Sequence, residues 1–336
     1  MSASTLLSVN DLRMHFPVKE GILLRAARHN KAVDGVSFDI GTGETLGLVG
    51  ESGCGKSTLG RCIARLYKPT EGSIRFEGDE IATLRNRHLL PYRRDIQMIF
   101  QDPMESLNSR HTVGDIIEEP LVIHKLGDRQ WRSKRINELL DIVGLPARSA
   151  TRFPFEFSGG QRQRIGIARA IALNPKLVIC DKPVSALDVS IQSQILNLLV
   201  DLQKEFNLSY LFIAHDLAVV KHVSDRIAIM YLGKFVETGD GEDIYRDPKH
   251  PYTNSLISAI PMPNPHRKVE RQIIAGDVPS PINPPSGCPF HPRCPKAMDR
   301  CKHEPPALRP IASGHEVSCH LDFESKLKQG RSEGTG

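Results

Sequence analysis

The sequence of 336 residues lacks any long hydrophobic run. No window approaches the roughly 18–20 continuous apolar residues that a helix needs to cross a bilayer. The first residues also lack a basic stretch followed by an apolar one, so we predict no signal peptide. We therefore expect a cytosolic protein that reaches a membrane only by docking onto a partner.

Concentrated positive charge is also missing. The net charge is +5, and the basic residues are scattered rather than gathered into a run. A solvated surface explains this distribution better than a nucleic-acid-binding patch, so we expect no nucleic-acid partner. The seven cysteines do not indicate disulfides, because such bonds are rare in the cytosol. Four of them crowd into the last fifth of the chain and need another explanation.

The strongest positive signal is a glycine-rich phosphate loop. Residues 45–49 form a short apolar run that predicts a strand, and residues 57–66 have helical spacing. The sequence GESGCGKS between them fits the phosphate-loop pattern at every fixed position. The glycines let backbone N–H groups surround a phosphate at a helix N-terminus. The candidate nucleotide-binding residues are Gly50, Glu51, Ser52, Gly53, Cys54, Gly55, Lys56, Ser57 and Thr58.

Within this loop, Lys56 is the residue type that reaches the β- and γ-phosphates, and Ser57 is the type that ligates Mg²⁺. Further polar residues follow apolar strands: Gln101, Asp181 and His215. The runs at 177–180 and 209–214 are typical of buried parallel strands, and helical segments are expected at 193–206 and 217–222. Asp181 is therefore placed to hold Mg²⁺ through a water.

The remaining segments complete an outline of the fold. Residues 7–16 and 33–40 alternate like antiparallel strands, with a loop expected at 19–31. Residues 112–150 are expected to be helical. Beyond residue 261 the chain is rich in proline and glycine, which predicts a small extension outside the main sheet.

In this order the motifs resemble those of the ATP-binding subunits of ABC transporters, and the resemblance covers almost the whole chain. It implies that Gln101 is the Q-loop glutamine, which touches Mg²⁺ and the attacking water and senses the membrane subunits. It also implies that His215 is the switch histidine, which hydrogen-bonds the γ-phosphate. It also implies that Asp188 belongs to the D-loop, and that Phe16 stacks on adenine unless it packs in the core instead. The signature motif, which acts on the ATP of a partner, is Ser158, Gly159, Gly160 and Gln161, preceded by Phe157 where leucine is commoner.

The resemblance also implies an α/β fold. An ABC-type P-loop ATPase domain would have a RecA-like parallel-sheet core, an antiparallel β subdomain and an α-helical subdomain. We place this domain at residues 1–260, with the helical subdomain at about 103–165. A cysteine-rich C-terminal extension would follow at 261–325 and a flexible tail at 326–336.

One position departs from the family pattern. The family has a catalytic glutamate directly after the Mg²⁺-holding aspartate, and this chain has Lys182. A protonated ammonium cannot accept a proton from water, so we predict that the chain's own site binds Mg²⁺-ATP but turns over slowly. A naturally degenerate site, an engineered substitution and a harmless change remain alternatives.

The four C-terminal cysteines are candidate metal ligands: Cys288, Cys294, Cys301 and Cys319. Zinc sites usually include two cysteines two to four residues apart, and no pair here is that close. Four thiolates at wider spacing suit an iron–sulfur cluster at least as well. The surrounding sequence resembles the extension of oligopeptide and dipeptide importers, most closely the second ATPase subunit of oligopeptide permeases, and this resemblance implies a [4Fe–4S] cluster.

The resemblance implies several partners: a second, homologous ATPase subunit, two transmembrane permease subunits and an extracytoplasmic peptide-binding protein. The assembly would lie at the cytoplasmic face of a bacterial inner membrane. One alternative is an essentially non-catalytic nucleotide-binding subunit of such a transporter, and another is an importer of a different substrate such as nickel. A soluble DNA-maintenance ATPase is disfavoured, because the segment between loop and signature is only a compact helical one.

Overall fold

The computed structural model describes residues 4–20, 25–260, 274 and 276–323, and its strands form two sheets. The smaller sheet is antiparallel, with the order β2-β1-β4-β5. The larger has the order β11-β12-β10-β9-β3-β8-β7-β6 and is parallel from β9 to β6. The strands are β1 (Thr5–Glu20), β2 (Arg25–Gly41), β3 (Thr45–Val49), β4 (Glu71–Phe76), β5 (Asp79–Glu80), β6 (Ile96–Ile99), β7 (Leu177–Asp181), β8 (Ser209–Ile213), β9 (Arg226–Tyr231), β10 (Lys234–Asp240), β11 (Arg309–Ala312) and β12 (His315–Val317).

Helix boundaries follow local capping chemistry. Thr112 and Asp115 form a capping box at the start of α4, and Ser158 and Gln161 form another at the start of α6. Asn207 ends α7 in the left-handed conformation that helix C-termini favour. The helices are α1 (Lys56–Ile63), α2 (Leu90–Asp95), α3 (Pro103–Ser106), α4 (Val113–Ile123), α5 (Arg129–Ile142), α6 (Gly159–Ile171), α7 (Val189–Phe206), α8 (Leu217–Val223), α9 (Gly241–Arg246), α10 (Pro251–Ser258) and α11 (Asp299–His303), with 3₁₀ turns η1 (Asn86–His88), η2 (Ala147–Thr151), η3 (Pro154–Glu156) and η4 (His291–Arg293).

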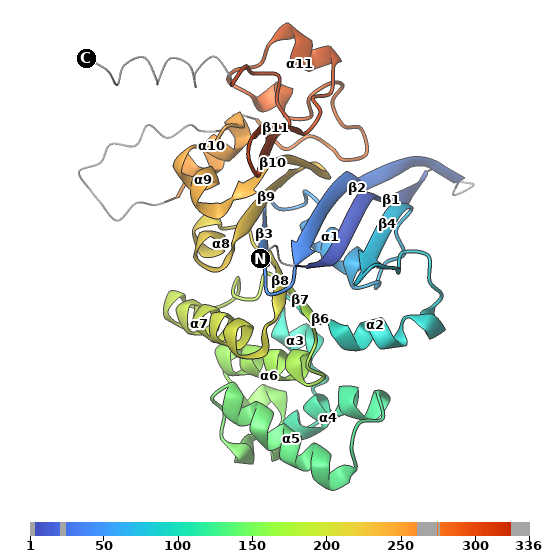
Figure 1. Cartoon of the computed structure of the whole chain (residues 1–336), viewed down its shortest axis with the longest axis vertical. Helices are drawn as coiled ribbons and strands as arrows, with labels where there is room; N and C mark the ends of the chain where they lie inside the picture. The colour runs from blue at the N-terminus through green and yellow to red at the C-terminus, as the bar shows by residue number, and fades with distance from the viewer. Residues whose placement is uncertain (1–3, 21–24, 261–273, 275, 324–336) are drawn as a thin grey trace, which may run out of the picture.

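Two apolar clusters hold these elements together. Leu59 and Ile63 of α1 are fully buried between the smaller sheet and the strands β3, β7 and β8. Alternate residues of β7 and β8 point to the opposite face, where they pack with α4, α5, α6 and α7. Both strands are buried along their whole length, as the apolar runs predicted. In Figure 1, α4 and α5 lie at the end of the molecule opposite α11.

The structure corrects two expectations. The C-terminal extension is not outside the main sheet, because β12 pairs with β10 and β11 pairs with β12. This pairing covers the edge of β10, which would otherwise be open. The sequence did not reveal β11 and β12 because strands this short show no periodic pattern. In addition, β1 and β2 pair from Thr5↔Gly41 to Glu20↔Arg25, so the strands occupy most of the segment predicted as a loop.

None of the helices in the described residues is both long and apolar enough to span a bilayer. The predicted tail at 326–336 lies outside the described residues, as does most of the linker after α10. The boundaries of the domains stay a prediction.

Candidate nucleotide site

The phosphate loop joins the end of β3 to the start of α1 and is packed tightly by its glycines. A β-carbon on Gly50 would lie 2.1 Å from the carbonyl oxygen of Met230 on β9. A β-carbon on Gly55, where φ is +109°, would lie 1.9 Å from the carbonyl oxygen of Ala32 on β2. Only glycine therefore lets the loop backbone approach both strands this closely.

The lysine of the loop is held inside it. Lys56 is 3% exposed, and its Nζ donates hydrogen bonds to the carbonyl oxygens of Gly50 at 2.6 Å and Glu51 at 2.9 Å. Burial lowers the pKa of Lys56, while the neighbouring Cys54 opposes that shift. The ammonium group is thus positioned at the centre of the loop, where a bound phosphate would replace its carbonyl partners.

Two oxygen-bearing side chains meet beside the loop. The Ser57 hydroxyl donates a hydrogen bond to Asp181 Oδ1 at 2.8 Å, and Asp181 is 2% exposed at the end of β7. Mg²⁺ prefers such oxygen ligands and binds through one or two carboxylates together with phosphate oxygens and waters. The pair therefore fits Mg²⁺ bound with a nucleotide. Within the described residues, no group of three or more His, Cys, Asp or Glu is arranged to hold a metal ion without such help.

Lys182 lies next to this pair and contacts the Q-loop position. Its N–H donates to the carbonyl oxygen of Ile213 at 2.8 Å, and its backbone has a φ of 49°. Its Nζ donates to Gln101 Oε1 at 3.0 Å. The charge of Lys182 also lowers the pKa of Lys56, after the larger effect of burial. The structure thus brings together Lys56, Ser57, Asp181, Lys182 and Gln101 at the carboxyl ends of the parallel strands.

Two other predicted site residues, His215 and Phe16, have different surroundings. His215 is exposed just after β8. Phe16 is half-buried, and its ring meets that of Tyr67 edge-on with centroids 5.6 Å apart. Adenine stacking by Phe16 stays a prediction.

The signature motif lies at the N-terminus of α6 and packs against the segment that contains Asp188. A β-carbon on Gly160 would lie 2.5 Å from Ile191 Cγ2, and one on Gly159 would lie 3.4 Å from Leu187 Cδ2. Ser158, Gln161 and Asp188 are exposed. The motif thus presents an exposed polar surface at the start of α6.

Comparison with known proteins identifies the family. A sequence profile described as "ABC transporter" matches residues 33–185. The oligopeptide transport ATP-binding protein AppF of Bacillus subtilis is 52% identical over 320 residues, which cover 94% of this chain and 97% of that protein. This chain belongs to the ABC transporter ATP-binding proteins.

Further relatives and solved structures agree. The putative oligopeptide transport ATP-binding protein YkfD of B. subtilis is 52% identical over 96% of this chain and 98% of that protein. The dimeric post-hydrolysis structure of the ATP-binding cassette MJ0796 with ADP and Pi has a TM-score of 0.63 and 31% identity, covering 70% of this chain and 98% of that one. The ABC ATPase fold predicted from the motifs is therefore confirmed. A second profile, "Oligopeptide/dipeptide transporter, C-terminal region", matches residues 236–301.

The C-terminal region of this ABC protein gathers its four cysteines. All four are free thiols, with Cys288 and Cys301 buried and the other two half-buried. The Cys288 N–H donates to the Cys301 carbonyl oxygen at 2.8 Å. Burial raises the pKa of Cys288 to about 11, and the thiols of Cys319, Cys301 and Cys294 add to the shift. Among the described residues, these cysteines do not form a group that is arranged to hold a metal ion.

Sequence reasoning missed two residues that contact the phosphate loop from this region. Arg293 makes an ion pair with Glu51 at 2.7 Å, and the Tyr252 hydroxyl accepts the Glu51 N–H at 2.8 Å. No signal in the sequence pairs residues that lie more than 200 positions apart.

Proposed function

We propose that this chain is an ATP-binding subunit that powers the import of oligopeptides or dipeptides. The observation that carries the proposal is the similarity over nearly the full length to AppF, an oligopeptide transport ATP-binding protein. The match of residues 236–301 to the C-terminal region of oligopeptide/dipeptide transporters supports the same substrate class. The protein would act at the cytoplasmic face of a bacterial inner membrane.

ATP would be bound between two ATPase subunits. Lys56 would bind the β- and γ-phosphates, the N-terminus of α1 would face their charge, and Ser57 and Asp181 would hold Mg²⁺. When bound, Mg²⁺ supplies charge neutralisation at the phosphates. The exposure of Ser158 and Gln161 supports a role across the interface, on the ATP held by a second, homologous subunit. His215, Gln101 and Asp188 would join the closed site from this chain.

A groove beside the Q-loop offers a place for the permease subunits. A hollow of about 1010 Å³ is lined by Gln101, Phe100, Arg93 and Arg169, among others. Leu66 and Ile123 on its walls are 51% and 55% exposed. Because Gln101 also contacts Lys182 beside the nucleotide site, closure on ATP would be transmitted to whatever fills this groove. A peptide-binding protein would deliver substrate from the other side of the membrane.

Lys182 makes the chain's own site slow in this scheme. Lys182 stands at the sequence position where the family resemblance leads one to expect a glutamate, and its Nζ donates a hydrogen bond to Gln101 Oε1 at 3.0 Å. The ammonium would stabilise bound ATP through charge and would not activate water. The partner's site, completed by this chain's signature, would then carry most of the hydrolysis. Lys182 also favours the second candidate function, an essentially non-catalytic nucleotide-binding subunit of the same kind of transporter.

We further propose that the four C-terminal cysteines hold a [4Fe–4S] cluster. Support comes from the four free thiols of this region and from the hydrogen bond between the Cys288 N–H and the Cys301 carbonyl oxygen. Four thiolates around one zinc ion lie about 3.8 Å apart, because each Zn–S bond is about 2.3 Å long, whereas a cluster spans a wider cage. Loading would release thiol protons. Iron and sulfide analysis of the purified protein tests the proposal, and a zinc-only result would overturn it.

Uptake of a labelled peptide in cells that lack the chain tests the main proposal. The wild-type gene should restore uptake, Lys56→Ala should not, and Lys134→Ala, at an exposed lysine on α5, should restore it. If the wild-type gene restored nickel uptake and not peptide uptake, the substrate class would be wrong.

A further inference from the structure

Arg293 connects the cysteine-rich region to the phosphate loop. It ends η4, directly before Cys294, and reaches Glu51 across 242 residues of sequence. Its Nη1 and Nη2 donate to the two carboxylate oxygens at 2.7 Å and 3.0 Å. The Arg293 side chain is 6% exposed and that of Glu51 is 26% exposed. A bidentate and largely buried pair of this kind fixes both position and orientation.

The surroundings of the pair are rigid. Arg293 Nη1 also donates to the Tyr231 hydroxyl at 3.4 Å. Tyr231 on β9, Tyr252 on α10 and Phe290 before η4 form an aromatic cluster with ring centroids 4.8 to 5.3 Å apart. All three rings are fully buried. The loop residue Glu51 is thereby held at its side chain by Arg293 and at its N–H by Tyr252.

The charge of Glu51 explains why this contact matters for a nucleotide. Glu51 is part of the loop that surrounds phosphate, and its carbonyl oxygen accepts a hydrogen bond from Lys56. An unpaired carboxylate here would repel the phosphates and compete for the ammonium of Lys56. The guanidinium of Arg293 neutralises it.

We propose that Arg293 is a positioning residue of the phosphate loop, through which the affinity for ATP depends on the folded cysteine-rich region. The proposal rests on the proposed binding of ATP and adds a regulatory input to that site. A change that unfolds the segment around Cys288, Cys294 and Cys301 would release Arg293 and leave Glu51 unpaired. Couplings between two such sites are typically about 5–150-fold in affinity, and we expect about tenfold here.

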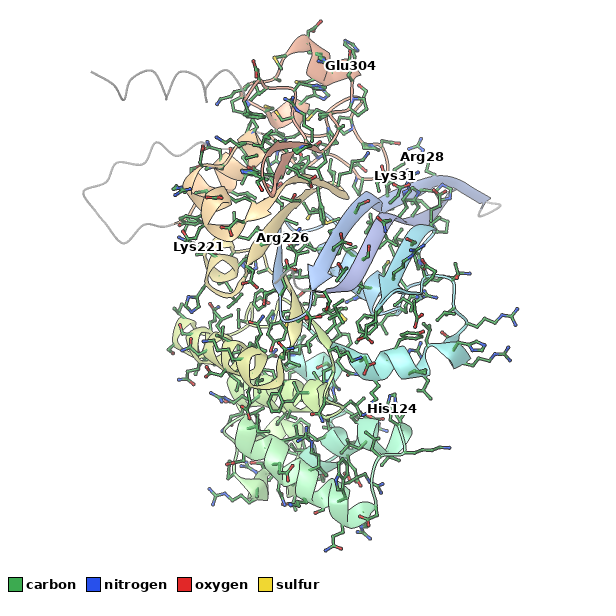
Figure 2. All side chains as sticks on the ribbon, in the orientation of Figure 1. Arg28, Lys31, His124, Lys221, Arg226 and Glu304 are labelled. Atoms are coloured by element: carbon green, nitrogen blue, oxygen red, sulfur yellow. The ribbon has the colours of Figure 1, made fainter. Side chains whose placement is uncertain are left out.

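A double-mutant cycle on the full chain tests the proposal, with a fluorescent ATP analogue and Mg²⁺ as the probe. The variants are Arg293→Met, Glu51→Gln and their combination. The control is Arg300→Met, an arginine of the same region whose Nε pairs with Glu304 at 2.6 Å, at the outer end of the molecule in Figure 2. Melting curves confirm that each variant folds.

Arg293→Met should weaken binding by about tenfold in the wild-type background and by less than about threefold in the Glu51→Gln background. Arg300→Met should stay within about twofold of its parent in both. Equal losses in the two backgrounds, or none in either, would overturn the proposal. If Arg293→Met does not fold, Arg293→Lys serves instead, because it keeps the charge and loses the bidentate geometry. Failure of the wild type to bind ATP would overturn the proposed function and this coupling together, whereas normal binding by the wild type with equal losses in the two backgrounds would overturn the coupling alone.

Discussion

Replacing Lys182 by glutamate should convert a slow ATP site into a fast one. The backbone at this position is fixed by the hydrogen bond from its N–H to Ile213, and the side chain reaches Gln101 at 3.0 Å beside the Ser57–Asp181 pair. The φ of 49° is equally unfavourable for lysine and glutamate, so the exchange adds no backbone strain. A carboxylate at this position has the lone pairs that an ammonium lacks.

The size of the effect follows from general base catalysis. Such a group typically contributes about 10²–10⁴ in rate, or about 2.7–5.5 kcal/mol of activation free energy. Lys182→Glu should therefore raise the hydrolysis rate at this site by at least about 10². Lys182→Gln removes the positive charge and supplies no base, so it should gain less than about tenfold.

The assay is single-turnover hydrolysis of labelled ATP in the assembled dimer, with the partner's own phosphate-loop lysine replaced to silence its site. Comparing the glutamate and glutamine variants separates the base from the charge. The reasoning is refuted if the two variants are equally fast, or if the wild-type site already hydrolyses ATP as fast as Lys182→Glu.

Three further predictions test other parts of the structure. Gly55→Ala should abolish binding of the ATP analogue, because its β-carbon would lie 1.9 Å from the Ala32 carbonyl oxygen. Gly53 also has a positive φ, but the space around its β-carbon is open, so Gly53→Ala should cost only about 1–2 kcal/mol of stability in urea unfolding. Ser158→Ala should slow hydrolysis at the partner's site about tenfold while this chain's own affinity for ATP, measured by titration, is unchanged; a loss at its own site instead would contradict the cross-interface role. Burial lowers the pKa of His250 to about 4, so the unfolded chain binds the proton first as the pH falls. Between about pH 6.5 and 4 the wild type should therefore lose about 1.4 kcal/mol of stability per pH unit relative to His250→Asn. If urea unfolding gave both proteins the same pH dependence of the free energy of unfolding, this prediction would be wrong.

The nucleotide site could be predicted from the sequence because its parts are local. Each candidate residue follows an apolar run, and parallel strands place their carboxyl ends at one edge of a sheet. Ser57 contacts Asp181 there, and Lys182 contacts Gln101, while their roles toward a nucleotide stay predictions. Ser158 is exposed at the start of α6, and its action on a partner stays a prediction.

Other features have no local signal. The strand β1 continues past the predicted strand at 7–16 to Glu20, and a register shift between Val18 and Lys19 interrupts its pairing in the part that was missed. The strand β12 has only three residues, and its pairing with β10 depends on distant sequence. Arg293 and Glu51 meet only because the C-terminal region folds back over β9, which no periodicity indicates.

The central claim is that the two ATP sites of the assembled dimer are unequal, and the nucleotide that stays bound after many turnovers tests it most directly. We predict that the isolated dimer retains ATP at the phosphate loop of this chain while ADP leaves the partner's site, and that Lys56→Ala removes the retained ATP. Recovery of ADP alone from both sites of the wild-type dimer would contradict the account.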